Sequence, residues 1–401
     1  MWELIRANQR RSMALFLLMG LGLILLGAAI SYYLNPAGMG IDGVIVALFI
    51  WLIMSLISYY NGAKILLSAS NAKKVTKEVH PQLFNIVEEM KLASGLPVMP
   101  EIYIINEEAP NAFAAGRSPK HAVVAVTAGL LTRLNRDELQ GVIAHEMGHI
   151  RNRDIRFMTL AGVMLGSIVM ISQIFLRGML YTGGGARYRS SNSNSGQGQA
   201  IIMIVALVLS ILVPIFATML YYSISRKREY LADASGARFT RYPEGLASAL
   251  EKISGAHIEM KSANDVTAPM YISLPFSKKR KSAGLYSTHP PIEERIRILR
   301  AMHGAGYLNY QEAYWEVKGK KGSIIPGSGL KEGSDPGIRQ AWEGPAVDPS
   351  TVKRDTGNLM MAVNDYTFIN CSCGLRIKVP PAYSSDTVRC PRCGKNHPTG
   401  R

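Results

Sequence analysis

Four long apolar runs constrain this chain more than any other feature of its sequence. Residues 13–34, 43–63, 157–176 and 200–224 contain no Lys, Arg, Asp or Glu. A helix that crosses the hydrocarbon core of a bilayer needs about 20 apolar residues, so each run is long enough to span a membrane. The alternative is that the runs form buried core helices of a large soluble domain, and it applies best to the second pair. The first run is too long for a cleaved signal peptide.

The composition favours a membrane protein with a folded core. Charged residues make up only 18% of the 401 residues, whereas about a quarter is usual in soluble domains. The 48% apolar share excludes a wholly disordered chain. Four cysteines are too few for a disulfide-dense scaffold. A net charge of +16 is compatible with nucleic acid, anionic lipid or a membrane topology with basic loops inside.

The positions of the basic residues favour the membrane topology. If both termini are cytoplasmic, the cytoplasmic flanks hold fifteen Lys and Arg, distributed as three in 1–12, four in 64–77, three in 151–156 and five in 226–241. The two outer links hold none (35–42) and three (Arg177, Arg187 and Arg189). This positive-inside pattern predicts a multi-pass protein of the cell membrane (inner or plasma membrane), with a cytoplasmic active site. The Gly/Ser/Asn-rich second link is predicted to be flexible.

A candidate metal-binding helix covers residues 137–154. Its apolar residues recur at helical spacing, and Asn135 with Glu138 forms a plausible N-terminal cap. Strands are predicted upstream, at 101–105 and 121–127. His145 and His149 are four residues apart, so they lie about 40° apart on one face of the helix. Two imidazoles in this arrangement can bind one zinc ion, although two unrelated histidines on a surface helix are the alternative.

Glu146 lies beside this pair, about 100° around the helix from His145. A carboxylate there flanks the metal and can take the proton from a zinc-bound water. A catalytic zinc also needs a third protein ligand. Glu229 and Asp233 are four residues apart on a predicted helix, so one carboxylate can bind metal while the other accepts the N–H of a ligating histidine. The spacing does not assign these roles, and Glu229 could instead pair with its basic neighbours.

Three motifs together resemble those of a known family. HEMGH, then REYLADASGA after two hydrophobic segments, then THPPIEERI, are similar to the membrane-embedded M48 zinc metallopeptidases, most closely the HtpX protease branch, over about residues 65–305. The resemblance implies that His145, His149 and Glu229 bind zinc, that Glu146 is the general base and that Asp233 supports a ligand. It also implies an α+β gluzincin-type domain at the cytoplasmic membrane face, with membrane proteins or misfolded proteins as substrates in quality control.

Two shorter segments also match this family. Asn111, Ala112, Phe113 and the following Ala are similar to its edge segment, which pairs with an extended substrate. A turn after Pro110 that leads into a strand is the alternative. His289, followed by two prolines, is similar to the family's His-Pro motif, where an imidazole can stabilise a developing oxyanion. The alternative is an ordinary turn residue.

The four cysteines form two short pairs near the C-terminus. Cys371 and Cys373 are followed by Gly374, and Cys390 and Cys393 by Gly394. Glycine permits the tight turn that directs backbone N–H groups at thiolates, and four thiolates suit a structural zinc. The segment between the pairs begins LRIKVPP, which alternates like a strand. These features predict a zinc ribbon. Two disulfides would be unusual in the cytoplasm, and a histidine (His397) is a weaker fourth ligand than Cys.

The predicted architecture is a mainly α membrane protein with four transmembrane helices, a cytoplasmic α+β peptidase domain and a small β zinc ribbon. The predicted boundaries are a hairpin at 1–63, a peptidase domain at 64–315, a Gly/Pro/Lys-rich linker at 316–357 and the ribbon at 358–401. The predicted function is a zinc endopeptidase of the membrane. The alternative is a catalytically silent zinc-binding membrane adaptor that acts through its ribbon, against which the intact base argues. Nucleic acid is not expected as a partner. The ribbon is expected to be an adaptor for substrates or partners, and the alternative is that its basic residues bind nucleic acid.

Overall fold

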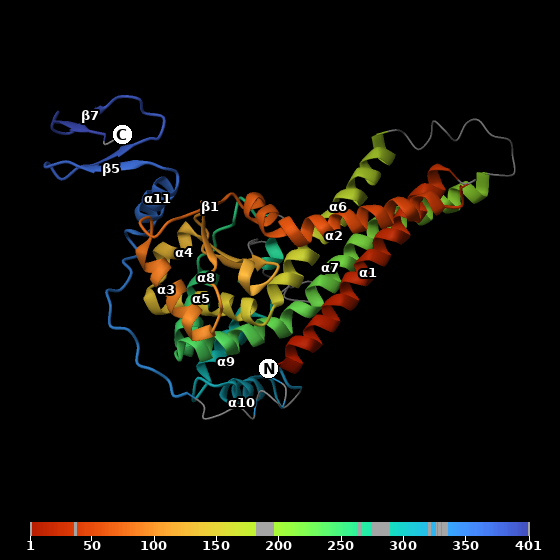
Figure 1. Cartoon of the computed structure of the whole chain (residues 1–401), viewed down its shortest axis with the longest axis horizontal. Coiled ribbons are helices and arrows are strands. Elements are labelled where there is room, and N and C mark those ends of the chain that lie inside the picture. Colours follow the sequence, from red (N-terminus) through yellow and green to blue (C-terminus); the bar gives the residue numbers. More distant parts are fainter. Residues whose placement is uncertain are drawn as a thin grey trace.

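The structure, a computed structural model, describes residues 2–35, 38–181, 196–263, 267–273, 289–319, 322–325, 327, 330 and 336–399. Its long helices are α1 (Trp2–Leu34), α2 (Ile41–Ala69), α6 (Asp154–Tyr181) and α7 (Gly196–Thr240). Its shorter helices are α3 (Pro81–Ser94), α4 (Ala128–Arg133), α5 (Arg136–Arg151), α8 (Pro243–Gly255), α9 (Ile292–Arg300), α10 (Tyr307–Lys318) and α11 (Val352–Val363). The long helices project to one side of a domain that contains the shorter ones (Figure 1).

The four apolar runs all lie within these long helices. Four segments are long and apolar enough to cross a membrane, namely Ser12–Leu34, Ile41–Ala69, Asp154–Met179 and Ile201–Met219. Large apolar side chains on each of them, such as Leu21, Phe49, Ile174 and Phe216, are 50–63% exposed. Hydrocarbon can cover these faces, so the prediction is confirmed as four candidate spans of sufficient length and apolar composition. Residues 182–195, including Arg187 and Arg189 of the link predicted to be flexible, lie outside the described residues.

The sheet of the domain has the order β1 (Ala72–Lys74), β2 (Glu101–Ile105), β4 (Ala122–Thr127) and β3 (Ala112–Gly116). Strand β4 pairs in parallel with β2 and antiparallel with β3. The strands predicted at 101–105 and 121–127 are therefore confirmed as β2 and β4. The segment that begins at Asn111 leads into β3, which lies at an edge of the sheet.

Helix α5 carries the HEMGH motif through the core of the domain. The predicted cap is present, since the Asn135 side chain and the Glu138 side chain each accept the other residue's backbone N–H. Glycines let α5 and α7 approach closely. A Cβ atom added at Gly148 would lie 3.1 Å from the carbonyl oxygen of Ala232, and one at Gly236 would lie 3.1 Å from the backbone nitrogen of His145. This close approach places the acidic residues of α7 opposite the histidines of α5.

Helix α7 joins the membrane region to the domain without a break. It runs for 45 residues, about 68 Å at 1.5 Å per residue, through the fourth apolar run and on to Glu229 and Asp233. The sequence indicated two segments here, an apolar run and a separate acidic helix. The structure shows one continuous helix, in which Pro214 lies inside the transmembrane part.

Parts of the predicted linker 316–357 lie against the domain. Arg339 donates to Asp137 Oδ1 at 2.5 Å and to Gln140 Oε1 at 2.7 Å, at the start of α5. Helix α11 begins at Val352, inside the predicted linker, and its Thr356 hydroxyl lies 2.6 Å from that of Thr132 in α4. Apolar residues add to these polar contacts, since Ile324, Ile325 and Val363 are buried in the main hydrophobic core of the domain. The segment predicted as a linker is therefore partly docked on the domain.

Candidate active site and metal centres

Three buried side chains from α5 and α7 converge on one point. The Nε2 atoms of His145 and His149 are 3.2 Å apart, and their rings are perpendicular. Glu229 Oε1 lies 3.4 Å from His149 Nε2, and Glu229 Oε2 lies 3.6 Å from His145 Nε2. Two ligand atoms of a tetrahedral zinc, each about 2.0–2.1 Å from the metal, lie about 3.4 Å apart. The three side chains therefore have the spacing of a metal-binding group.

The Glu229 carboxylate shows that a cation fits this point. Its Oε2 atom is buried and has no hydrogen-bond partner, which is costly for a carboxylate unless a cation faces it. Burial opposes ionisation of Glu229. The neighbouring side chains of His289, His149 and Arg295 nevertheless outweigh burial and hold the pKa of Glu229 well below its usual range. The carboxylate is thus ionised, as a metal ligand must be, and two imidazoles with one carboxylate are a zinc donor set.

A second carboxylate stands behind each histidine. Asp233 Oδ1 lies 2.9 Å from His145 Nδ1, and Asp154 Oδ2 lies 3.3 Å from His149 Nδ1. Each carboxylate can accept the Nδ1–H of its histidine, which leaves Nε2 as the ligating atom and fixes the ring. The contact of Asp233 agrees with the role expected from the sequence. Asp154, five residues after His149, is a supporting residue that the sequence analysis did not identify.

Arg295 of α9 is the other functional residue that the sequence analysis missed. It is fully buried and binds Asp233 in a bidentate manner, with Nε–Oδ2 and Nη2–Oδ1 distances of 2.8 and 2.7 Å. Its Nη1 lies 3.4 Å from Glu229 Oε2. Arg295 therefore balances the charge of two buried carboxylates. Its position within the THPPIEERI motif was the available signal, but no spacing rule connects it with residues 62 positions earlier.

Glu146 lies beside the three-residue metal-binding group but is not part of it. Its side chain is buried, and burial raises its pKa to about 7. The backbone of Ala114 in β3 lies against its carboxylate. A carboxylate with a pKa near neutrality can both accept and return a proton under physiological conditions. The location of Glu146 agrees with the role of general base that the sequence suggested.

His289 also reaches the site, just before α9. Its Nε2 lies 3.6 Å from Glu229 Oε2, and the ring is buried. Burial lowers the pKa of His289 to about 4. The imidazole is therefore neutral near pH 7 and can donate one N–H. The residues just before His289 lie outside the described residues, so the alternative of an ordinary turn stays a prediction.

The edge segment is occupied by the chain's own residues. The Asn111 side-chain amide donates to the Ser273 carbonyl at 2.8 Å, and the Ile272 N–H donates to the Ala112 carbonyl at 2.9 Å. Phe113 is buried against Tyr271 with ring centroids 5.3 Å apart. All three residues predicted to contact substrate are thus engaged in internal contacts. In an extended strand, the backbone groups of alternate residues point to the same edge. The next backbone position after Ala112 that faces outward is therefore Ala114, which lies beside Glu146.

Residues 77–303 match the family described as Peptidase family M48. The chain belongs to this family. It is 45% identical over 302 residues to a protein named "Protease HtpX homolog" from Caldanaerobacter subterraneus subsp. tengcongensis, which covers 75% of this chain and 98% of that protein. Proteins of the same name from Dictyoglomus turgidum (45% identity) and Listeria monocytogenes serotype 4a (43% identity) also cover 75% of the chain, and 94% and 100% of their own lengths.

The chain is therefore an M48 metallopeptidase of the HtpX type and a multi-pass membrane protein. Its metal-binding group of two histidines and a glutamate is the zinc protease site of this family. Among solved structures, the crystal structure of S. mikatae Ste24p is similar, with 19% identity, a TM-score of 0.40 and coverage of 75% of this chain and 67% of that one.

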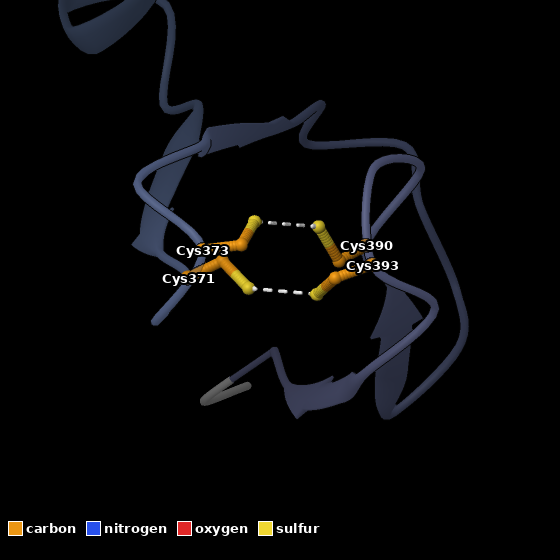
Figure 2. A group of neighbouring side chains, drawn as sticks. All are labelled: Cys371, Cys373, Cys390 and Cys393. Carbon is orange, nitrogen blue, oxygen red and sulfur yellow. Dashed lines mark hydrogen bonds between the residues drawn. The ribbon is translucent and has the colours of Figure 1, made fainter.

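The four cysteines form a second candidate metal centre, beyond the part of the chain that matches the family. The Sγ atoms of Cys371 and Cys393 are 3.4 Å apart, and those of Cys373 and Cys390 are 3.6 Å apart (Figure 2). No disulfide joins these four thiols. Ligand atoms of a tetrahedral zinc–thiolate site lie about 3.8 Å apart, given Zn–S bonds of about 2.3 Å. The four-cysteine cluster can therefore hold a metal ion.

The turns and strands around the cysteines agree with a zinc ribbon. Gly374 and Gly394 have φ values of 83° and 75°, the left-handed conformation that the predicted turns require. The predicted strand is confirmed as β6 (Arg376–Val379), which pairs antiparallel with β5 (Thr367–Asn370). The second pair of strands is β7 (Thr387–Arg389) and β8 (Asn396–Pro398). Backbone N–H groups from the Cys393 turn lower the pKa of Cys390 to about 6, which favours a ligating thiolate.

A Cys390→Ser variant should lose the zinc of the ribbon and keep that of the active site. Elemental analysis of the purified protein should show about two zinc ions per chain for the wild type and about one for the variant. Because so small a module depends on its metal, hydrogen exchange over 366–399 should become much faster. His397→Ala is the matched control, since His397 lies outside the cluster. Equal zinc contents in wild type and Cys390→Ser would contradict a metal at the ribbon.

Proposed function

We propose that this protein is a zinc endopeptidase that hydrolyses peptide bonds in the cytoplasmic segments of membrane proteins, in the service of quality control. The observation that carries the proposal is the continuity of α7, which extends from a transmembrane span to Glu229 in one helix. This continuity keeps the site close to the membrane surface, where segments that leave a bilayer are within reach. The cytoplasmic location follows from the predicted positive-inside pattern. The relatives named "Protease HtpX homolog" support the class of reaction.

The residues of the site divide the reaction among them. His145, His149 and Glu229 would hold the zinc ion, which would supply Lewis-acid chemistry at this point. Glu146 takes the proton of the attacking water and returns it to the leaving amine, for which a pKa of about 7 is well suited. The neutral imidazole of His289 donates its N–H to the developing oxyanion.

Substrate binding is proposed to use the remaining part of the β3 edge. Residues 271–273 cover the edge as far as Ala112, whose carbonyl accepts the Ile272 N–H. Ala114 is two residues further on the same strand and lies against the base Glu146. An extended peptide that pairs with β3 at Ala114 would place its scissile carbonyl next to the catalytic carboxylate. Pairing would end there, because the Gly116 N–H already donates to the Thr159 hydroxyl at 3.1 Å. Backbone pairing of this kind tolerates many sequences, as quality control requires.

The ribbon is proposed to hold a second, structural zinc and to act as an adaptor for substrates or partners. Its docking helix α11 packs against α4 and the ribbon itself extends away from the domain (Figure 1). A protein that acted through the ribbon alone would have no use for a buried carboxylate beside the metal-binding group. Burial of Glu146 costs stability when the group is ionised, so its presence favours the enzyme over the silent adaptor.

Comparison of membrane proteomes from cells with wild-type or Glu146→Gln protein tests the proposed function. Specific membrane proteins should accumulate in cells with the variant. New N-termini that occur only with the wild type should map to segments adjoining transmembrane helices, on the cytoplasmic side. Equal expression of the two proteins is the control. Identical proteomes, or new termini confined to soluble proteins, would overturn the proposed substrate class.

A further inference from the structure

A cavity of about 410 Å³ lies where α1, α2 and α6 meet the catalytic domain. This volume is typical of sites for small ligands. One part of its lining is apolar and comes from the transmembrane helices, including Phe16, Leu52 and Leu160. Another part is cationic and consists of Arg153, Arg156 and Arg228. The cavity is therefore amphipathic along the direction of the transmembrane helices.

The cationic part of the cavity contains donors without acceptors. Arg228 is only 3% exposed, and its Nε and Nη1 atoms have no hydrogen-bond partner. Its nearest carboxylate is that of Asp154, at 3.6 Å from Nε. Among the described residues that line the cavity, Asp154 is the only acid, and it is also in contact with His149. Buried N–H donors normally find an acceptor, so the two unbonded donors of Arg228 beside this shared carboxylate point to an anionic ligand.

A second cavity, of about 540 Å³, adjoins the cationic part of the first cavity. It shares Arg153 and Arg156 with the first cavity, and none of the described residues that line it is acidic. Its other basic residues are Arg117, Lys120 and Arg151. The guanidinium groups of Arg117 and Arg156 lie 5.9 and 5.3 Å from the ring centre of Tyr59 in α2. Tyrosine with arginine is the combination found at the level of lipid headgroups.

We propose that an anionic phospholipid occupies the first cavity, from the leaflet nearest the catalytic domain. Its phosphate binds Arg153, Arg156 and Arg228, and one acyl chain lies along the apolar residues of α1, α2 and α6. Basic pockets between transmembrane helices have the charge that selects such headgroups. A free phosphate ion would leave the apolar part unfilled, and an apolar peptide segment would leave the Nε and Nη1 donors of Arg228 without an acceptor. Through Asp154, the bound headgroup lies next to the residue that orients His149.

Binding can be measured by native mass spectrometry of the full-length protein in detergent, titrated with phosphatidylglycerol or phosphatidylcholine of identical chains. Phosphatidylglycerol should bind at least tenfold more tightly. The double variant Arg153→Asn, Arg156→Gln should abolish this preference. Asn suits position 153 because the residue there has a φ of 61°. Lys227→Gln removes an exposed charge on α7 outside the cavity lining and should leave the affinity within twofold of the wild type.

The apolar part is tested by Leu52→Trp, which fills the cavity without a change of charge. It should weaken phosphatidylglycerol binding at least tenfold. Inorganic phosphate, added alone, should not displace the lipid. The proposal is overturned if both lipids bind equally, if phosphate at millimolar concentration displaces phosphatidylglycerol, or if both cavity variants bind it like the wild type. Slower cleavage of a membrane substrate by these variants, with unchanged lipid affinity, would assign the cavity to substrate instead. These outcomes do not depend on whether the proposed quality-control function is correct.

Discussion

A Glu146→Gln variant should cleave peptide substrates about 10²–10⁴-fold more slowly than the wild type, because an amide cannot accept the proton of the attacking water. The two side chains have nearly the same size, so the buried position should stay filled. Zinc should remain bound, since Glu146 is outside the group formed by His145, His149 and Glu229. The measurement is cleavage of casein or a model membrane substrate in detergent, with the zinc content determined on the same samples. Full activity with retained zinc would refute the assignment of the base.

The stability of the chelator-treated protein gives an independent check on the same residue. Burial raises the pKa of Glu146 from 4.5 to about 7 in the folded protein. Because the pKa is higher in the folded protein than in the unfolded chain, ionisation of Glu146 destabilises the folded state. The free energy of unfolding is therefore unaffected by Glu146 below pH 4.5 and falls as the pH rises from there through about 7. In metal-free samples, Glu146→Gln should therefore unfold at a higher temperature than wild type at pH 8, and the difference should shrink toward pH 5. An equal difference at both pH values would contradict a buried, strained carboxylate.

The part of the site that could be predicted from the sequence depends on local geometry. The four-residue spacing of His145 and His149 places them on one face of α5 in any helix, and the cap formed by Asn135 and Glu138 marks where that helix begins. The apolar runs follow from bilayer thickness alone. The glycine turns of the ribbon follow from the restricted backbone of other residues. In each case the physical cause acts within a few residues.

The part that could not be predicted depends on contacts between distant segments. Arg295 reaches Asp233 across 62 positions, and Arg339 reaches Asp137 across 202. No periodicity connects such pairs, because each depends on how two separate helices or segments dock. The same holds for the Ile272–Ala112 hydrogen bond that closes part of the β3 edge. The resemblance to the M48 family assigned the third metal ligand, but charge balance around that ligand was visible only in the assembled structure.

Replacement of Arg295 by methionine should destabilise the protein by about 3–5 kcal/mol, the range observed when one partner of a buried ion pair is removed. Arg295 is fully buried and is the bidentate partner of Asp233. Methionine fills much of the same space but leaves that carboxylate uncompensated. Because Asp233 also holds His145, the affinity for zinc should fall about 10–100-fold. Thermal unfolding in detergent and zinc competition with a chelator measure the two effects.

Two further variants separate the loss of charge balance from a general defect. Arg300→Met, in the same helix α9, removes a half-exposed arginine that binds Glu244 and Glu251, and it should cause a far smaller loss. Asp233→Asn added to Arg295→Met removes the unpaired charge but keeps an oxygen that can accept the His145 N–H. The double variant should therefore be more stable than Arg295→Met alone, as expected for coupled neighbours. If the two substitutions instead lower the free energy of unfolding additively, Arg295 stabilises the protein by packing and not by neutralising Asp233.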